Sequence, residues 1–179
     1  MRLDEVFLVP LNLGHLWEAL MGALKCFSSP GHLVIALGPE RRTPSVAVDV
    51  VLVRPDGSIV LVKRAKEPFK GYWALPGGFV RYGERVEDAA RREAREETGL
   101  EVAIEGLVGV YSEPDRDPRG HVISIAFLAR EVGGLLRAAS DAAEVRAFKI
   151  LPERLAFDHA RIIGDAVRKF GLKISSPEV

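Results

Sequence analysis

The sequence is poor in cysteine, carries no net charge and has no long uninterrupted apolar run. Its single cysteine, Cys26, excludes an internal disulfide and a zinc site built from several cysteines. We interpret this residue as a small buried apolar side chain. The 25 basic and 25 acidic residues give a formal net charge of zero, so the positive field of a nucleic-acid-coating protein is missing. We therefore expect no nucleic-acid partner.

The most apolar region, residues 6–25, does not reach the length of a membrane span, because Pro10, His15 and Glu18 interrupt it. It also lacks the basic start, the unbroken apolar core and the small-residue cleavage site of a secretory signal. From these absences we expect no membrane association and a cytoplasmic location.

With 179 residues, of which 47% are apolar and 28% charged, the chain has the composition of a globular protein with one domain of ordinary size. We expect that domain at 44–179 and an N-terminal extension at 1–43. Apolar residues recur at helical spacing over 12–27, which predicts an amphipathic helix, and residues 32–37 predict a short strand. The extension is a capping element, a dimerisation arm that would make the protein a homodimer, or an upstream-extended start.

From residue 45 onward the pattern is that of a mixed α/β domain. The triplet Pro55-Asp56-Gly57 predicts a hairpin turn, a second glycine-rich turn is expected at 71–78, and Gly99 is placed to end a helix. Strands are predicted at 46–54, 58–64, 101–112, 122–132 and 144–151, and helices at 86–97 and 158–170. The order β-β-α-β-β-β-α indicates an α/β sandwich with a mixed sheet.

The segment RREAREETGL at 91–100 places Glu93, Glu96 and Glu97 on one face of the predicted helix. Like charges so placed destabilise a helix by ~0.2–0.5 kcal/mol per pair. Carboxylate oxygens are the ligands that Mg²⁺ and Mn²⁺ prefer, and a bound ion would remove the repulsion and create a phosphate-binding surface. The alternative is a solvated, salt-bridged helix face, which is the commoner outcome for a run of charges.

The stretch from Gly78 to Leu100 resembles the Nudix box, G-x5-E-x7-R-E-U-x-E-E-x-G-U, in which U is aliphatic. Gly77 precedes it and adds flexible backbone that can approach an ion or a phosphate. The matching residues are Gly78, Glu84, Arg92, Glu93, Ala94, Glu96, Glu97, Gly99 and Leu100. One departure is Arg85, where related sequences often carry a Ser or Thr helix cap.

The resemblance implies a Nudix-type α-β-α sandwich that hydrolyses a nucleoside diphosphate linked to another group, with Mg²⁺ or Mn²⁺ as cofactor. In that family pattern, the metal ligands would be Glu93, Glu96, Glu97 and the backbone carbonyl of Gly77. Arg92 would hold the glutamates in position, and Glu84 would support the loop or an outer ion. The candidates for the general base are Glu93 and, outside the box, Glu144, whose alternative role is that of a surface acid at a strand edge. The predicted catalytic residues are Arg92, Glu93, Glu96 and Glu144.

The loop YSEPDRDPRGH at 111–121 is similar to one in the ADP-ribose pyrophosphatase subgroup, where a proline lies about fifteen residues beyond the box; Pro114 is near that place. In this interpretation Arg116 or Arg119 faces phosphate and ribose oxygens. The alternative is a loop locked by its own Asp–Arg pairs. The segment AFDHARII at 156–163 resembles the same subgroup, and its Phe157, Asp158 and His159 are interpreted as packing and capping at a helix start. The predicted substrate-binding residues are Arg64, Gly78, Pro114, Arg116 and Arg119.

We therefore expect a small nucleotide as the partner, most specifically ADP-ribose, which would give AMP and ribose 5-phosphate. One alternative is a nucleoside triphosphate pyrophosphatase that acts on oxidised nucleotides of the 8-oxo-dGTP type. The other is a non-catalytic Nudix domain that senses ADP-ribose. The zero net charge and the complete set of box glutamates disfavour the sensor.

Overall fold

The computed structural model describes residues 8–9, 26–29, 32–35, 43–138 and 142–174. The chain divides into two compact units, Met1–Arg42 and Thr43–Val179. Among the described residues, no helix combines the length and the apolar character of a membrane span.

The first unit contains a small antiparallel sheet of three strands in the order β1-β3-β2. Its strands are β1 (Leu8–Val9), β2 (Cys26–Ser29) and β3 (His32–Ile35). The strand predicted at 32–37 is confirmed over its first four residues. The helix predicted over 12–27 is wrong at its end, because Cys26 and Phe27 pair with Ile35 and Val34 in the sheet. The rest of that helix lies outside the described residues, as does the side chain of Cys26.

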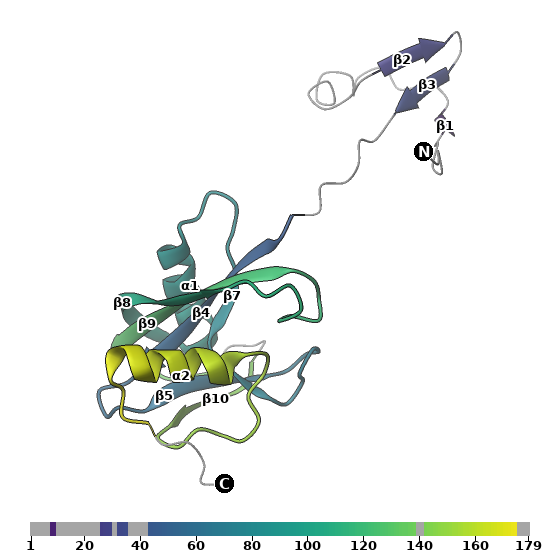
Figure 1. The fold of residues 1–179 in the computed structure, drawn as a ribbon. Helices are drawn as coiled ribbons and strands as arrows, with labels where there is room; N and C mark the ends of the chain where they lie inside the picture. The colour runs from purple at the N-terminus through teal and green to yellow at the C-terminus, as the bar shows by residue number, and fades with distance from the viewer. Residues whose placement is uncertain (1–7, 10–25, 30–31, 36–42, 139–141, 175–179) are drawn as a thin grey trace. The chain divides into compact units, whose positions relative to one another are not determined.

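The second unit is built on one mixed sheet with a helix on each face (Figure 1). The sheet has the order β10-β5-β4-β9-β8; β4 and β9 run parallel, and the other neighbours run antiparallel. The bounds are β4 (Ser45–Val53), β5 (Ile59–Arg64), β6 (Trp73–Ala74), β7 (Gly77–Phe79), α1 (Val86–Thr98), β8 (Leu100–Tyr111), β9 (Val122–Gly134), β10 (Ala142–Phe148) and α2 (His159–Phe170).

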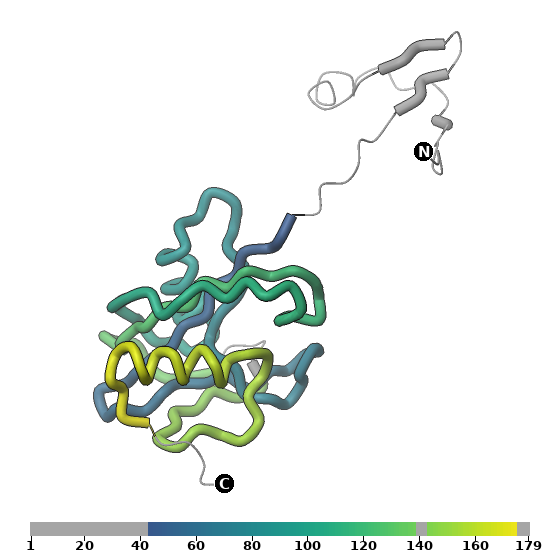
Figure 2. The backbone as a smooth tube through the Cα atoms, in the orientation of Figure 1, coloured from purple at the N-terminus to yellow at the C-terminus, as the bar shows by residue number. Residues whose placement is uncertain are grey.

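Alternation along β4 explains how the sheet is covered on both sides. Val50 and Leu52 belong to the core that contains Ala89, Ala90 and Ala94 of α1. Val51 and Val53 belong instead to the core under α2, with Ile162, Ile163 and Ala166. Because successive side chains of a strand point to opposite faces, one apolar strand supplies both cores. The α-β-α sandwich expected from the resemblance is therefore confirmed, and Figure 2 shows α2, in yellow, running across the sheet.

Helix α1 has the predicted end and lacks a side-chain cap at its start. Gly99 adopts the left-handed conformation, with φ of 72°, and donates its amide to the carbonyl of Arg95. Arg85 occupies the N-cap position and makes no capping hydrogen bond, as its side chain has no acceptor.

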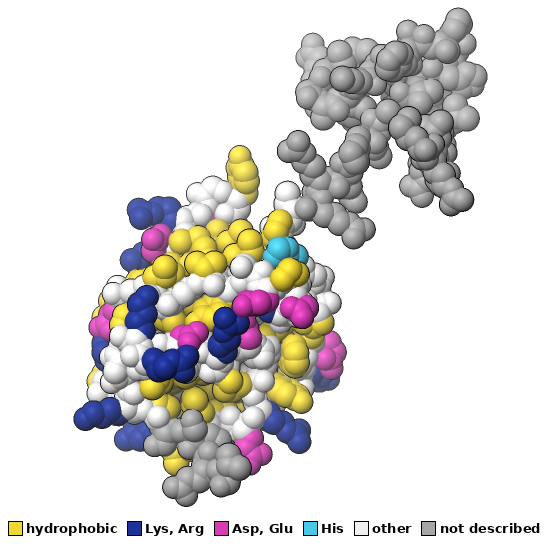
Figure 3. Space-filling view, in the orientation of Figure 1, with side chains coloured by type: hydrophobic (Ala, Val, Ile, Leu, Met, Phe, Trp, Pro, Cys, Tyr) yellow, Lys and Arg dark blue, Asp and Glu magenta, His cyan; other side chains and the backbone are white. Residues whose placement is uncertain are grey.

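On the face of the molecule that Figure 3 shows, basic and acidic side chains are interspersed.

The segment 71–78 differs from the prediction of a simple turn, because it contributes the strands β6 and β7. Strand β4 pairs with β5 only at Leu52 and Val53, while Ala47–Asp49 pair with β7. The end of β5 pairs with β6 instead. The sheet is thus split between β4 and β5, and the turn from β6 to β7 fills the split, where Val50 donates its amide to the carbonyl of Pro76 at 2.8 Å. This split positions the candidate site.

Candidate active site

Arg92 lies among the acidic side chains of the box and explains how they coexist on one helix. Its side chain is only 15% exposed. The guanidinium binds both oxygens of Glu84, from Nε at 2.7 Å and from Nη2 at 2.9 Å. Its Nη1 contacts Glu93 at 2.5 Å and Glu96 at 3.4 Å. One cation therefore offsets the repulsion among three carboxylates and fixes where two of the predicted metal ligands point.

Glu84 links the loop before α1 to the helix. The hydrogen bonds from Arg92, followed by the one from the amide of Arg81, lower the pKa of the Glu84 carboxyl to about 2. Reciprocally, the hydrogen bond with Glu84 raises the pKa of the Arg92 guanidinium. Of the two roles considered for Glu84, these contacts correspond to support of the loop.

The two glycines before the box bring backbone against the helix carboxylates. The amide of Gly77 donates to Oε2 of Glu97 at 3.0 Å. A Cβ at Gly78 would lie 2.4 Å from Oε1 of Glu93, and a Cβ at Gly77 would lie 2.2 Å from the carbonyl oxygen of Val48. Only glycine leaves room for the chain between β4 and these carboxylates, so the sequence Gly77-Gly78 is a steric requirement of the site.

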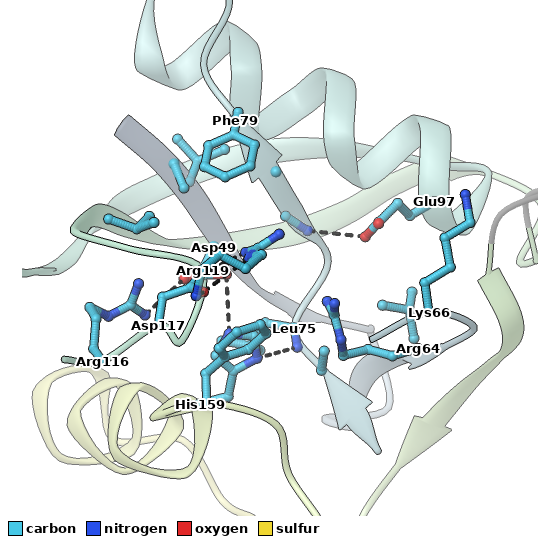
Figure 4. A pocket seen from close by; sticks show the side chains of 18 of the residues that line it. Asp49, Arg64, Lys66, Leu75, Phe79, Glu97, Arg116, Asp117, Arg119 and His159 are labelled. Carbon is cyan, nitrogen blue, oxygen red and sulfur yellow. Dashed lines mark hydrogen bonds and ion pairs between the residues drawn. The ribbon is translucent and has the colours of Figure 1, made fainter. Parts of the chain in front are cut away.

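A cavity of about 220 Å³ lies where the sheet splits (Figure 4). Figure 4 shows Arg64, the last residue of β5, and Lys66, which follows that strand, on one side, and Arg116 and Arg119, from the loop after β8, on the other. The predicted site residues that line the cavity are Arg64, Gly77, Gly78, Glu97, Arg116 and Arg119. The other predicted site residues, which lie outside this lining, are Arg92, Glu93, Glu96, Pro114 and Glu144.

Arg64 and Arg119 share the aromatic ring of Phe157. The guanidinium of Arg64 lies 4.9 Å from the ring centroid and that of Arg119 lies 5.5 Å from it. Phe157 has a φ of 51°, an unusual backbone conformation for a residue with a Cβ. Burial, together with the charge of Arg119, lowers the pKa of the Arg64 guanidinium. Two cations held beside one cavity favour an anionic ligand.

The loop 111–121 contains one Asp–Arg pair of its own, as the alternative for it required, and a second pair joins the loop to the start of α2. Arg119 binds both oxygens of Asp117, at 2.6 and 3.0 Å. Arg116 is nearly buried and binds Asp158 through Nη2 at 2.5 Å and Nε at 3.0 Å. Asp158 stands at the N-cap of α2 but makes no capping hydrogen bond, so its predicted capping role is wrong: its side chain binds Arg116 instead. Pro114 is exposed.

Glu144 lies on β10 opposite Lys63, at 3.5 Å, and also binds Arg146. Its carboxylate is therefore held by two cations at the strand surface. This arrangement corresponds to the alternative of a surface acid at a strand edge.

A buried polar pair that the sequence did not predict lines the cavity: Asp49 of β4 and His159 of α2, which are 7% and 4% exposed. The Oδ1 atom of Asp49 lies 3.3 Å from Nε2 of His159, and its Oδ2 accepts the hydroxyl of Ser124. Burial alone would raise the pKa of the Asp49 carboxyl, but His159, Ser124 and Arg116 outweigh it and hold this pKa below its ordinary value. One feature of the sequence could have indicated this buried pair, because Asp49 is a charged residue within an apolar strand.

The donors at the glycine turn fit a hard divalent cation. Among the described residues, no three Asp, Glu, His or Cys side chains form a group that could hold a metal ion by themselves. Mg²⁺, however, is usually bound by one or two carboxylates together with substrate phosphates and waters. Glu93 and Glu97 offer carboxylate oxygens beside the backbone of Gly77 and Gly78, a set of hard oxygen donors.

Comparisons with known proteins agree with this geometry. The NUDIX domain family matches residues 43–170. The ADP-ribose pyrophosphatase of Methanocaldococcus jannaschii is 55% identical over 127 residues, which cover 70% of this chain and 74% of that protein.

Two crystal structures extend the comparison. A MutT/nudix family protein from Enterococcus faecalis has a TM-score of 0.67 and 34% identity, covering 76% of this chain and 65% of that one. A bifunctional NMN adenylyltransferase/ADP ribose pyrophosphatase from Francisella tularensis, complexed with AMP and a Mn ion, has a TM-score of 0.65 and 29% identity. That match covers 73% of this chain and 43% of the Francisella chain, so this chain spans less than half of that protein.

The pair formed by Glu84 and Arg92 gives the stability a defined pH dependence. Because the pKa of Glu84 falls from its ordinary 4.5 to about 2, its ionised form stabilises the fold above about pH 4.5, and this contribution is lost as the pH falls toward 2. We expect the wild type to be more stable than Glu84→Gln at neutral pH and the difference to shrink steadily below about pH 4.5. Urea unfolding across this range measures it. A difference that is constant with pH would contradict the ionised pair.

Proposed function

Since this chain belongs to the Nudix family, we propose that it hydrolyses a nucleoside diphosphate linked to another group, with ADP-ribose as the main substrate and AMP and ribose 5-phosphate as products. The observation that carries the proposal is the contact of Glu93 and Glu97 with the Gly77-Gly78 backbone, beside a cavity with cationic walls. The 55% identity to the ADP-ribose pyrophosphatase of Methanocaldococcus jannaschii supports the choice of substrate. We assign this activity to residues 44–179.

We take Mg²⁺ or Mn²⁺ as the metal and propose Glu93, Glu96, Glu97 and the carbonyl of Gly77 as its protein ligands. A bound ion would offset the charge of the diphosphate and acidify a coordinated water. Arg92 keeps the carboxylates of Glu93 and Glu96 oriented, because it donates to both. Glu97 takes its orientation from the amide of Gly77.

The cationic walls of the cavity would bind the diphosphate. Arg119 is held in place by Asp117 and by stacking 5.2 Å from the ring centroid of Phe79, so little side-chain freedom is left to lose on binding. Arg64 is fixed by its hydrogen bond to the carbonyl of Pro68 at 2.7 Å. Arg116 supports the loop through Asp158. The cavity is below the ~300–1,000 Å³ of typical ligand sites, so part of a ligand as large as ADP-ribose would extend past it toward the glycine turn.

Of the two candidates for the general base, we favour Glu93. Its carboxylate lies against Gly78, at the turn that would carry the ion, whereas Glu144 lies on β10, opposite Lys63 of β5. A proton acceptor must lie within hydrogen-bond reach of the water that it activates. The position of Glu93 meets this requirement if water binds at the glycine turn.

A substrate panel tests the proposal. With Mg²⁺, we expect ADP-ribose to have a higher kcat/KM than NADH, diadenosine polyphosphates or 8-oxo-dGTP, and to yield AMP and ribose 5-phosphate. Glu97→Gln should lower kcat at least about 100-fold while the protein stays folded, because it weakens a metal ligand that contributes several kcal/mol in the transition state. Glu87→Gln, in the first turn of the same helix, is the matched control and should keep its activity.

The alternatives give different outcomes in the same panel. Release of pyrophosphate from 8-oxo-dGTP as the dominant reaction would replace the proposal with the triphosphate pyrophosphatase. Binding of ADP-ribose without turnover would replace it with the sensor.

A second test uses the steric requirement at Gly78. Gly78→Ala places a Cβ 2.4 Å from Oε1 of Glu93, so the carboxylate must move and turnover should fall by at least about tenfold. Gly164→Ala is the control, since its nearest neighbour, the end of Arg168, would lie 3.5 Å away. We expect the control to retain activity and to gain up to about 1 kcal/mol in unfolding free energy. Equal activity of both variants in a steady-state assay would show that the Gly78–Glu93 contact is not needed.

A further inference from the structure

His159, the first residue of α2, uses both ring nitrogens although it is almost fully buried. Its Nδ1 lies 2.9 Å from the backbone nitrogen of Leu75. A backbone N–H can only donate, so Nδ1 is the acceptor and carries no proton. The ring proton is therefore on Nε2, which faces Oδ1 of Asp49 at 3.3 Å. The imidazole joins α2 to the turn between β6 and β7.

That turn is held from two sides. His159 accepts the amide of Leu75, and the next residue, Pro76, accepts the amide of Val50 on β4. Gly77 follows immediately, and a Cβ there would lie 2.9 Å from Oδ1 of Asp49. The chain thus rests directly on the carboxylate that also binds His159. A shift of the imidazole would be passed to Gly77 through only two peptide units.

Asp49 and His159 belong to a closed ring of interactions. Arg116 lies 3.7 Å from Asp49 and binds Asp158, the residue covalently joined to His159. Ser124 of β9 donates its hydroxyl to Asp49 as well. The ring ties β4, β9, the loop 111–121 and α2 together, so the imidazole has little freedom to rotate. Because these contacts fix its orientation, His159 does more than fill space in the core.

We propose that His159 is a positioning residue: by holding the amide of Leu75, it fixes the Gly77 carbonyl and the Gly77 amide that orients Glu97, and so raises the affinity for a divalent ion. This inference rests on the proposed function of the Gly77–Glu97 site. His159 does not touch the substrate or the ion in this arrangement. Replacing a residue that orients a metal ligand without touching the ion typically weakens metal binding about 10–100-fold.

Two substitutions separate the two ring nitrogens. In His159→Asn the amide oxygen can take the place of Nδ1 and accept the hydrogen bond of Leu75, while the contact with Asp49 is lost. In His159→Gln the longer amide can take the place of Nε2 and donate to Asp49, while the amide of Leu75 loses its acceptor. Each variant removes one buried hydrogen bond, so a purely structural role predicts similar effects of both.

The readout is the dissociation constant for Mn²⁺, titrated into the folded protein without substrate. We expect H159Q to bind Mn²⁺ about 10–100-fold more weakly than the wild type and H159N to stay within about threefold. Equal losses in the two variants, or no loss in H159Q, would overturn the proposal while leaving the metal site of the proposed function intact. Failure of the wild type to bind Mn²⁺ would instead refute the proposed function, and this inference with it.

Hydrogen exchange in the wild type tests the same role of His159 and does not depend on whether H159Q folds. Coupling between two sites is reciprocal, so an ion that is bound more tightly when Leu75 is held must also stabilise that hydrogen bond. We expect saturating Mg²⁺ to slow the hydrogen exchange of the Leu75 amide by about tenfold or more, and that of Gly57, in the hairpin turn, to stay unchanged. An unchanged rate at Leu75 in protein that binds Mg²⁺ would overturn the proposal.

Discussion

The arrangement of the site depends on one guanidinium. Without Arg92, the carboxylate of Glu84 in the loop and those of Glu93 and Glu96 on α1 would repel one another. With it, the loop is tied to the helix and two of the acids keep fixed directions. The carboxylate of Glu93 is thereby held beside Gly78, where a divalent ion could use it. The helix tolerates its acidic face because the cation lies within it.

The second constraint is the split of the sheet between β4 and β5. The split leaves a cavity whose floor is β4 and whose walls come from β5, the loop 111–121 and the start of α2. The turn that fills the split ends in Gly77 and Gly78, so the cationic cavity and the acidic helix meet at the same two residues. A diphosphate lying between them would contact arginines on one side and the ion on the other.

The sequence predicted those parts of the site whose residues lie close together in the chain. The box residues lie within one loop and one helix, so their spacing placed Arg92, Glu93 and Glu97 correctly on α1, and Gly99 marked its end. The segment 71–78 was less predictable, since glycine and proline disfavour strands, yet pairing with β4 and β5 overrides that preference. The pair of Asp49 and His159 depends on where α2 meets β4. No local sequence pattern predicts that contact between α2 and β4. The pairing of Arg116 with Asp158 was unpredictable for the same reason, because Asp158 lies outside the loop of Arg116.

In the proposed function, the Gly77-Gly78 turn and the α1 glutamates together bind a divalent ion for the cleavage of a diphosphate. The most direct measurement is anomalous diffraction from crystals grown with Mn²⁺ and a non-hydrolysable ADP-ribose analogue. We expect Mn²⁺ to be coordinated by the Gly77 carbonyl and by the carboxylates of Glu93 and Glu97, with the diphosphate of the analogue as a further ligand. An analogue bound in the cavity with no Mn²⁺ at this turn, or with Mn²⁺ elsewhere, would contradict it.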